Sequence, residues 1–373
     1  MRLARLNLRN FRSYESLTIE PGPGLTVLWG RNGVGKTNLL EAIYFACTGR
    51  SCRTSSEREV VRFGSGFTRT EAVIADGVDE HTVTVGFEPG QPKRLQVNES
   101  SVERLTDVEV RPLVTVFLPD RLDLILGPPA LRRGHLDQAL VAMWPARRAT
   151  RAAYVAALAQ RNALVGRIRS GRSARSSLPA WDAELARHGI ELMRDRSALV
   201  ESISGAFTEH AALLGLDAEP ALRYRPRSKA RDTAELAAEL AAHVDQDLER
   251  GFTTHGPHRD DLVFRRAGHD LKAYGSRGQQ RLALLALLLA ERERIGEVRG
   301  APPLMLLDDV MSELDDRRRA ALAEVLLSGG QSVVTTTELA HVPGSERSDV
   351  VRLAVAVGTV LAAAGAPAER LAS

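Results

Sequence analysis

The sequence predicts an α/β fold, and three observations point to it. The apolar run Leu25-Thr26-Val27-Leu28-Trp29 is typical of a buried strand, and a glycine-rich loop and a helical pattern follow it. A second apolar strand, at 304–307, ends in two consecutive acids. Between these regions, residues 131–249 have helical periodicity. Strand, loop and helix in this order open an α/β nucleotide-binding domain. We therefore expect one such domain built from residues 1–130 and 250–373, with 131–249 inserted as a helical lobe.

The other elements follow from the spacing of apolar residues. Two short segments, from Leu3 to Phe11 and from Leu17 to Ile19, predict strands ahead of the buried one. Residues 67–117 contain alternating segments broken by Gly-Gln-Pro, which predicts an antiparallel meander. Ser170-Gly171-Arg172-Ser173 predicts a turn within the helical lobe. After residue 256 the α/β signals return as helix 278–294, strand 304–307, helix 315–327, strand 331–336 and strand 351–357.

Composition indicates an ordinary globular protein. The 373 residues are 44% hydrophobic and 26% charged, which argues against a mainly disordered chain. Two cysteines, Cys47 and Cys52, cannot build a disulfide framework, so we expect reduced thiols and a cytoplasmic location. The N-terminus lacks the apolar stretch of a signal peptide, and no run of about 18 apolar residues predicts a membrane span.

The basic residues are unusual in kind. The net charge is +3, and of 50 basic residues only Lys36, Lys93, Lys229 and Lys272 are lysine. Arginine binds phosphate through two parallel hydrogen bonds and suits nucleic acids. A coding-composition bias, which the many alanines also suggest, would produce the same excess. Both interpretations stay open.

The glycine-rich loop matches the P-loop pattern G-x-x-x-x-G-K-[ST] in full. Its glycines let backbone N–H groups surround phosphates, and the helix N-terminus favours their negative charge. Lys36 is expected to reach the β- and γ-phosphates of ATP, and Thr37 to supply a hydroxyl to Mg²⁺. The expected nucleotide-binding residues here are Gly30, Arg31, Asn32, Gly33, Val34, Gly35, Lys36 and Thr37.

A P-loop needs a distant carboxylate for its magnesium, and the acids after strand 304–307 supply one. They stand at the carboxyl end of the strand, where ligands of such sheets bind. Asp308 is the expected Mg²⁺ ligand, directly or through water, and Asp309 could polarise the attacking water. Asp309 and Lys36 are thus the candidate catalytic residues. The alternative is a strand-end pair that caps a helix.

Ser276-Arg277-Gly278-Gln279-Gln280 opens a strongly apolar helix and, taken alone, indicates only an N-capped helix start. The pattern S-x-G-Q-Q resembles the signature motif of ABC-type ATPases, and the segment 312–315 resembles their D-loop. That resemblance implies that Ser276, Gly278 and Gln279 contact ATP held by the P-loop of a second protomer. The ATP-bound state would be a head-to-head homodimer with two composite sites.

The whole chain resembles the RecF family of bacterial recombinational repair. The resemblance implies an ABC-type head of the SMC/Rad50 kind that carries a helical lobe in place of a long coiled coil. It also implies a slow, DNA-stimulated ATPase that acts as a switch at single/double-strand junctions and gapped duplex. Mediators of the RecO and RecR type would be partners in loading the RecA recombinase. The motifs that carry the resemblance lie in family order at 6–14, 32–44, 49–51, 128–137, 160–164, 256–262 and 306–318.

Three features depart from ABC-type ATPases. No Q-loop glutamine is evident near Phe117-Leu118-Pro119-Asp120, where we would expect it. The second acid is Asp309 where transporters have glutamate, and its shorter side chain fits a slow ATPase. Thr335-Thr336-Thr337 stands where a switch histidine would follow the strand, a feature that resembles RecF proteins and weakens the transporter interpretation.

Several alternatives stay open. A transporter nucleotide-binding subunit, an SMC-like structural head and a metabolic P-loop kinase share parts of the pattern. Arg2, Arg5, Arg9 and Arg12 could form a DNA-facing edge or a solvated strand face. Arg50 and Arg53 could approach phosphate across a dimer or lie in a plain surface loop. The remaining candidates, which could hold a metal or form a turn into a strand, are His255, His258, Asp260 and Asp261.

Overall fold

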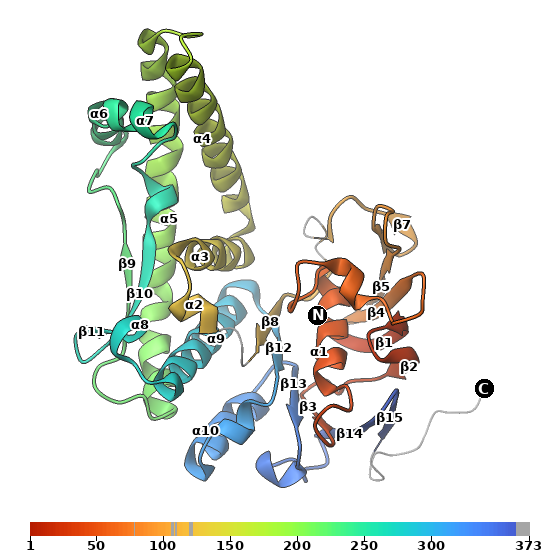
Figure 1. Cartoon of the computed structure of the whole chain (residues 1–373). Coiled ribbons are helices and arrows are strands. Elements are labelled where there is room, and N and C mark those ends of the chain that lie inside the picture. The colour runs from red at the N-terminus through yellow and green to blue at the C-terminus, as the bar shows by residue number, and fades with distance from the viewer. Residues whose placement is uncertain (78, 106–107, 109, 119–121, 363–373) are drawn as a thin grey trace. The chain divides into compact units, whose positions relative to one another are not determined.

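The computed structural model describes residues 1–77, 79–105, 108, 110–118 and 122–362. The chain forms two compact units, one of Met1–Arg121 with Ile295–Ser373 and the other of Leu122–Arg294 (Figure 1). The lobe expected at 131–249 lies inside the second unit, which also takes in 122–130 and 250–294. The division into an ATPase head and a lobe with the expected boundaries stays a prediction.

The first unit contains an antiparallel sheet with the strand order β2-β1-β4-β5-β6-β7. Apolar and polar residues alternate along its longer strands, so one face is buried and the other is exposed. β1 pairs with β2 on one side and with β4 on the other, and it is therefore an interior strand. The bounds are β1 Arg2–Phe11, β2 Tyr14–Ile19, β4 Thr68–Asp76, β5 Asp79–Phe87, β6 Arg94–Val97 and β7 Ser100–Ser101.

The second sheet of this unit is mostly parallel, with the order β15-β14-β3-β13-β12-β8. Its central strands are continuous apolar runs, because both faces are covered. The placement of β8 corrects one expectation: residues 114–117 leave the meander and pair with β12 in parallel. The bounds are β3 Leu25–Trp29, β8 Val114–Phe117, β12 Leu304–Leu307, β13 Ser332–Thr336, β14 Val351–Ala356 and β15 Thr359–Ala362.

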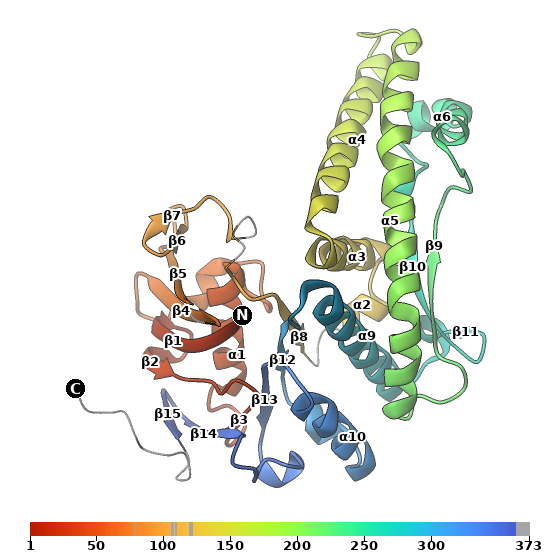
Figure 2. The same cartoon turned by 180° about the vertical axis from the view of Figure 1, so that it is seen from behind.

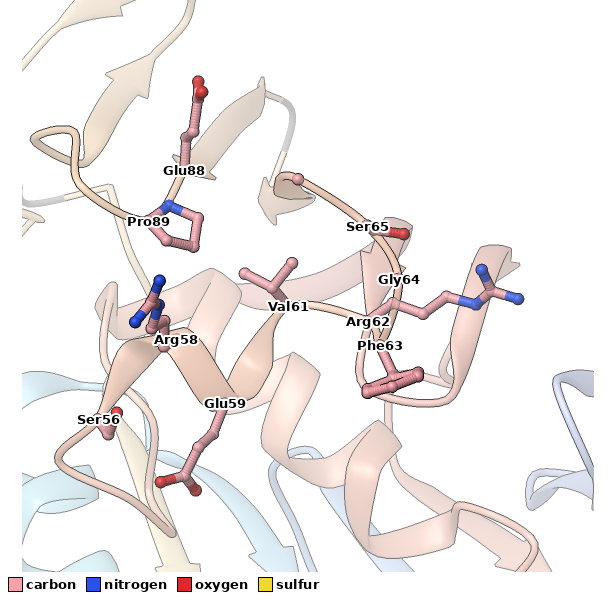
Figure 3. Close-up of a pocket in the computed structure, with 11 residues that line it drawn as sticks. Ser56, Arg58, Glu59, Val61, Arg62, Phe63, Gly64, Ser65, Glu88 and Pro89 are labelled. Atoms are coloured by element: carbon pink, nitrogen blue, oxygen red, sulfur yellow. The ribbon is translucent and has the colours of Figure 1, made fainter.

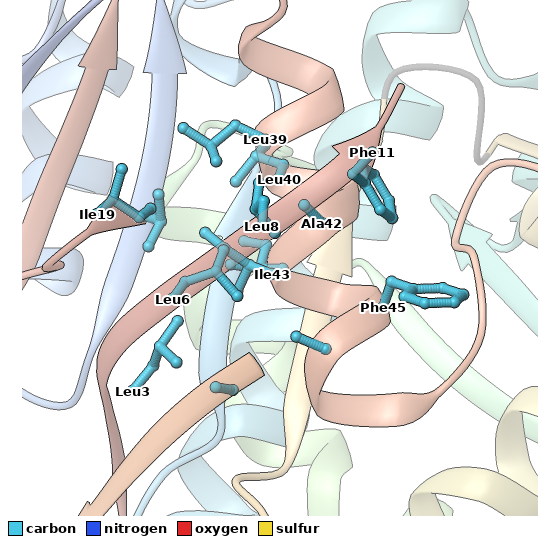
Figure 4. Close-up of a cluster of buried hydrophobic side chains, with 14 of the residues drawn as sticks. Leu3, Leu6, Leu8, Phe11, Ile19, Leu39, Leu40, Ala42, Ile43 and Phe45 are labelled. Atoms are coloured by element: carbon cyan, nitrogen blue, oxygen red, sulfur yellow. The ribbon is translucent and has the colours of Figure 1, made fainter. Parts of the chain in front are cut away.

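Helix α1 (Lys36–Thr48) packs against strands of both sheets and forms the centre of the first unit. Leu39, Leu40 and Ile43 are fully buried there together with Leu6 and other residues of β1 (Figure 4). Burying each such side chain contributes about 1.5–3 kcal/mol. This packing holds the N-terminus of α1 at the end of β3. The first unit also contains α10 (Asp316–Leu327) and the short 3₁₀ helices η1 (Glu57–Val60), η7 (Val310–Glu313) and η8 (Leu339–His341).

The second unit is mainly helical, and α4 and α5 lie side by side in it (Figure 2). It also contains a strand that the helical periodicity missed, β9, which pairs with β10 in the sheet β11-β10-β9. Its α-helices are α2 Asp123–Leu126, α3 Pro129–Met143, α4 Arg148–Arg169, α5 Leu178–Leu213, α6 Thr233–Ala242, α7 Val244–Arg250, α8 Leu271–Tyr274 and α9 Arg277–Arg299; the last residues of α9 belong to the first unit. Its strands are β9 Ala221–Arg225, β10 Asp261–Arg266 and β11 His269–Asp270. Its 3₁₀ helices are η4 Pro145–Arg147, η5 Arg175–Ser177 and η6 Pro257–Arg259.

Buried ion pairs connect the elements of the second unit. Arg161 is fully buried on α4 and donates to Asp182 of α5 and Asp247 of α7, each at 2.6 Å. Arg132 of α3 donates two hydrogen bonds to Asp261 of β10. Removing one partner from such a pair leaves an uncompensated buried charge, so losing either partner destabilises the unit.

No helix in the described part of the chain combines the length and the apolarity that crossing a bilayer requires.

The partly buried imidazole of His258 makes the second unit sensitive to acid. Its Nδ1 lies 2.7 Å from the hydroxyl of Tyr154 and its Nε2 2.9 Å from the carbonyl of Thr253, which suits a neutral ring. Burial lowers the pKa of His258 from 6.5 to about 4, and the charges of Arg259 and Arg133 act in the same direction.

We therefore expect the free energy of unfolding to fall by up to about 3 kcal/mol as the pH drops from about 6.5 to about 4, because only the unfolded chain takes up this proton. Urea unfolding at several pH values should give a flatter dependence for His258→Gln. His269→Gln, at an exposed position, is the control and should keep the slope. Equal slopes for all three proteins would contradict the assignment.

Candidate functional site

The P-loop needs glycine at two positions for reasons of space. It runs from the end of β3 to the first turn of α1, and its glycines have positive φ angles, 153° at Gly30 and 112° at Gly35. A Cβ on Gly30 would lie 2.4 Å from the carbonyl oxygen of Val355, and one on Gly35 would lie 2.9 Å from the hydroxyl of Tyr14. α1 then begins at Lys36 with no side-chain cap and no acid in its first turn. Such a helix N-terminus attracts anions.

Lys36 is folded back over this loop. Its Nζ donates to the carbonyl oxygens of Gly30 at 2.6 Å and Arg31 at 3.0 Å, and the residue is 7% exposed. Burial lowers the pKa of Lys36, and the nearby carboxylates of Asp309 and Asp308 oppose that shift. The loop therefore holds a cation among carbonyl oxygens, beside the helix N-terminus. An incoming phosphate would meet both.

Asp308 joins the P-loop to the end of β12. The hydroxyl of Thr37 lies 3.0 and 2.9 Å from its two carboxylate oxygens, and the hydroxyl of Thr335 donates to Oδ1 at 2.7 Å. Burial raises the pKa of Asp308, and these two hydrogen bonds oppose the shift. A hydroxyl and a carboxylate in contact form the all-oxygen donor set that Mg²⁺ prefers, so Thr37 and Asp308 fit this ion.

Asp309 has a left-handed backbone conformation. Its φ is +44°, in the left-handed region that L-residues avoid at a cost of about 1–2 kcal/mol. Its N–H donates to Thr335 at 2.9 Å, and its carbonyl accepts from Ser312 at 2.9 Å. Its Oδ1 is buried and has no hydrogen-bond partner among the described residues. That oxygen can accept a proton or a hydrogen bond from a molecule that enters the site.

A buried carboxylate that the sequence analysis missed ties the surrounding segments together. Glu41, one helical turn after Thr37, is fully buried and accepts two hydrogen bonds from Arg12 and one from Arg53. Arg53 also donates to Asn38 at 3.0 Å. The detectable signal was an acid on the apolar face of α1 with arginines on both sides along the chain. Arg12 is therefore not part of an exposed basic row.

The other arginines proposed for a DNA-facing edge lie on β1, an interior strand of its sheet. Arg2, Arg5 and Arg9 are exposed, and Arg5 pairs with Glu20 at 2.9 Å. Arg50 is also exposed. The side chains of Arg2, Arg5 and Arg9 therefore lie on a sheet face rather than at a sheet edge.

The signature segment belongs to the second unit. Ser276 Oγ accepts from the N–H of Gln279 at 3.2 Å, and Gln279 Oε1 accepts from the N–H of Ser276 at 2.9 Å. This reciprocal arrangement is a capping box at the start of α9. A Cβ on Gly278 would meet nothing closer than Ser276 Oγ at 3.9 Å, so the chain's own packing does not require glycine there.

The remaining sequence candidates have structural partners or lie outside the described residues. Asp260 accepts from Tyr224 and Arg196, and His255 lies 2.6 Å from Glu239. These contacts favour the turn interpretation over a metal site. Of the expected Q-loop stretch, Pro119 and Asp120 lie outside the described residues.

A separate open pocket of about 600 Å³ lies between η1, the segment after it and the end of β5 (Figure 3). Phe63 lines it and is 99% exposed. None of the P-loop residues lines this pocket.

Comparisons with known proteins give one consistent result. The model of the RecF/RecN/SMC N-terminal domain family matches residues 2–355. The chain is 38% identical to the DNA replication and repair protein RecF of Frankia alni, over 97% of this chain and all of that protein. It is 39% identical to the RecF of Symbiobacterium thermophilum, over 91% and 92% of the two chains.

Solved structures agree. The structure of the recombination mediator protein RecF with ATP in the RecFOR pathway matches with a TM-score of 0.84 and 28% identity, over 97% of both chains. An Smc head bound to the C-terminal winged-helix domain of ScpA matches with a TM-score of 0.58 and 17% identity, which shows a shared fold.

The glycine geometry of the P-loop predicts a difference between two alanine variants. Gly30→Ala places a methyl group against the backbone of β14, whereas Gly33→Ala, at φ 81° and in open space, adds backbone strain alone. We expect Gly30→Ala to lower the free energy of unfolding by about 1–3 kcal/mol more than Gly33→Ala does. Urea unfolding compares the two, and equal losses would mean that the loop moves freely away from Val355.

Proposed function

Because this chain belongs to the RecF family of DNA replication and repair proteins, we propose that it binds ATP and, in that state, clamps DNA during recombinational repair and replication. The observation that carries the proposal is the contact of Thr37 with Asp308 beside the buried Lys36. This is the arrangement that a P-loop requires to hold a nucleotide with its cation.

The proposed roles follow the geometry of the first unit. Gly30 to Thr37 surround the phosphates with backbone N–H groups, and Lys36 exchanges its bonds to loop carbonyls for phosphate oxygens. Thr37 and Asp308 hold Mg²⁺, which neutralises phosphate charge when bound. Asp309 accepts the proton of the attacking water through its buried Oδ1, which has no hydrogen-bond partner within the described ranges. A single short carboxylate in this role is consistent with slow turnover that serves as a switch.

The second unit supplies the complementary half of each site in an ATP-dependent homodimer. Gly278 is exposed, and no contact among the described residues requires glycine at this position. That leaves room for close approach of a phosphate bound to the partner protomer. Ser276 and Gln279 already point at the N-terminus of α9, whose partial positive charge favours that phosphate. An isologous pair then contains two equal sites.

DNA is the proposed ligand of the closed dimer. The net charge is +3, and Arg2 and Arg9 are exposed on β1. The similar RecF structure with ATP comes from the RecFOR pathway, so we propose RecO- and RecR-type mediators as partners. With them the protein would recognise single/double-strand junctions and gapped duplex in the cytoplasm and help to load RecA.

Removing Lys36 tests the proposal directly. Lys36→Ala should abolish ATP-dependent binding to gapped DNA, because the phosphates lose their charge partner. Lys229→Ala removes the same charge from an exposed position and should bind like the wild type. A gel shift with and without ATP measures the difference. ATP-stimulated binding by Lys36→Ala at the wild-type level would refute the proposal.

Mixing two inactive variants tests the composite site. Ser276→Arg should block closure and Lys36→Ala should lose nucleotide, yet a mixed dimer keeps one intact P-loop facing an intact signature. With random pairing, about half of the dimers are mixed, and each of these has one intact site of two. ATPase activity should therefore recover to roughly a quarter of the wild-type value. If sedimentation detects the mixed dimer and activity stays at the sum of the separate variants, the shared-site model is wrong.

A further inference from the structure

Thr335 occupies a special position at the end of β13. It lies on the strand between β3, which leads into the P-loop, and β12, which ends in the two acids. Its side chain is fully buried. Its hydroxyl donates to Asp308 Oδ1 at 2.7 Å and accepts from the N–H of Asp309 at 2.9 Å. One side chain therefore contacts both acids of the site.

The direction of these bonds is fixed by chemistry. A hydroxyl has a single proton, and a backbone N–H can only donate. Because Asp309 supplies a donor, the Thr335 proton is left for the carboxylate of Asp308. The hydroxyl thus orients the carboxylate of one acid while it holds the backbone of the next.

This second bond matters because the backbone at Asp309 is in the left-handed region. The N–H of Asp308 is held by the carbonyl of Phe117 on β8, at 3.0 Å. One residue later the chain leaves the strand with a φ of +44°, and its N–H turns to Thr335 on the opposite neighbouring strand. An unfavourable conformation persists only where surrounding contacts specify it. Thr335 supplies such a contact.

The bond to Asp308 differs from the one that Thr37 makes. The Thr37 hydroxyl also has one proton, and it lies within 3.0 Å of both carboxylate oxygens. If Thr37 turns towards a cation, it must give up its bond to Asp308. Thr335 comes from a separate strand and has no such competing role, so its bond can persist in both states.

We propose that Thr335 is a positioning residue that aligns the carboxylate of Asp308 for Mg²⁺ and the backbone of Asp309 for water activation. The inference rests on the proposed function. Thr336, the next residue, is equally buried, but its hydroxyl donates to the carbonyl of Glu338 at 2.9 Å and contacts neither acid. It therefore offers a matched control in the same strand.

The test compares Thr335→Val, Thr335→Ser and Thr336→Val. Valine has nearly the shape of threonine without the hydroxyl, and serine keeps the hydroxyl. ATP affinity is measured in EDTA and across a Mg²⁺ titration, and turnover is measured at saturating Mg²⁺. We expect Thr335→Val to raise the Mg²⁺ midpoint and lower kcat, each about tenfold, with KM changed less than about threefold. Affinity in EDTA should stay within about twofold of the wild type.

Thr335→Ser should recover most of both losses, and Thr336→Val should match the wild type in both. Wild-type Mg²⁺ dependence and turnover in Thr335→Val would overturn the inference, as would an equal loss in Thr336→Val or no recovery in Thr335→Ser. If Thr335→Val does not fold, Thr335→Cys replaces it, because a thiol donates weakly at similar size. A wild-type protein that fails to bind ATP in EDTA and in Mg²⁺ would instead refute the proposed function.

Discussion

The contact between the Thr37 hydroxyl and the Asp308 carboxylate is the constraint on which the nucleotide site depends. It joins residues 271 positions apart in sequence, and it forms because β3, β13 and β12 are neighbouring parallel strands. Parallel strands deliver their carboxyl ends to the same edge of a sheet, so the P-loop and the acid pair meet without any induced rearrangement. The core around α1 then holds Thr37 at that edge. The same helix carries Thr37 in its first turn and packs Leu39, Leu40 and Ile43 into the core.

Local patterns in the sequence were sufficient for most of the first unit. The strand Leu25–Trp29, the strand Leu304–Leu307 and the helices that follow them were predicted from unbroken apolar runs and helical spacing. The pairing of β8 in this unit and the strand β9 of the second unit were missed, because their partners are remote in sequence. β8 looks like a continuation of the meander until its parallel pairing with β12 is known, and β9 is a five-residue strand defined by its pairing with β10. The family assignment and the α/β head fold were confirmed by the comparisons.

The site shows the same division between local and remote information. A P-loop is a contiguous pattern, and it was found as one. Thr335 and Glu41 act through contacts made by the fold: a hydroxyl at a strand end is unremarkable until the acids lie beside it, and an acid in a helix is usually solvated. The arginine excess is also partly explained. Arg132, Arg161 and Arg196 neutralise buried aspartates of the second unit, so part of the basic composition stabilises the fold and is not available to a polyanion.

The backbone of β14 lies close to Gly30, the first glycine of the P-loop, although the two segments are made at very different times during synthesis. Val355, whose carbonyl leaves no room for a side chain on Gly30, is translated more than 300 residues after it. The second unit is contiguous, from Leu122 to Arg294, and all its strands are synthesised before β12, β13 and β14. Domains generally fold as units while the chain emerges. The second unit can therefore fold first. The P-loop gains its contact with β14 only after residue 355 has been made.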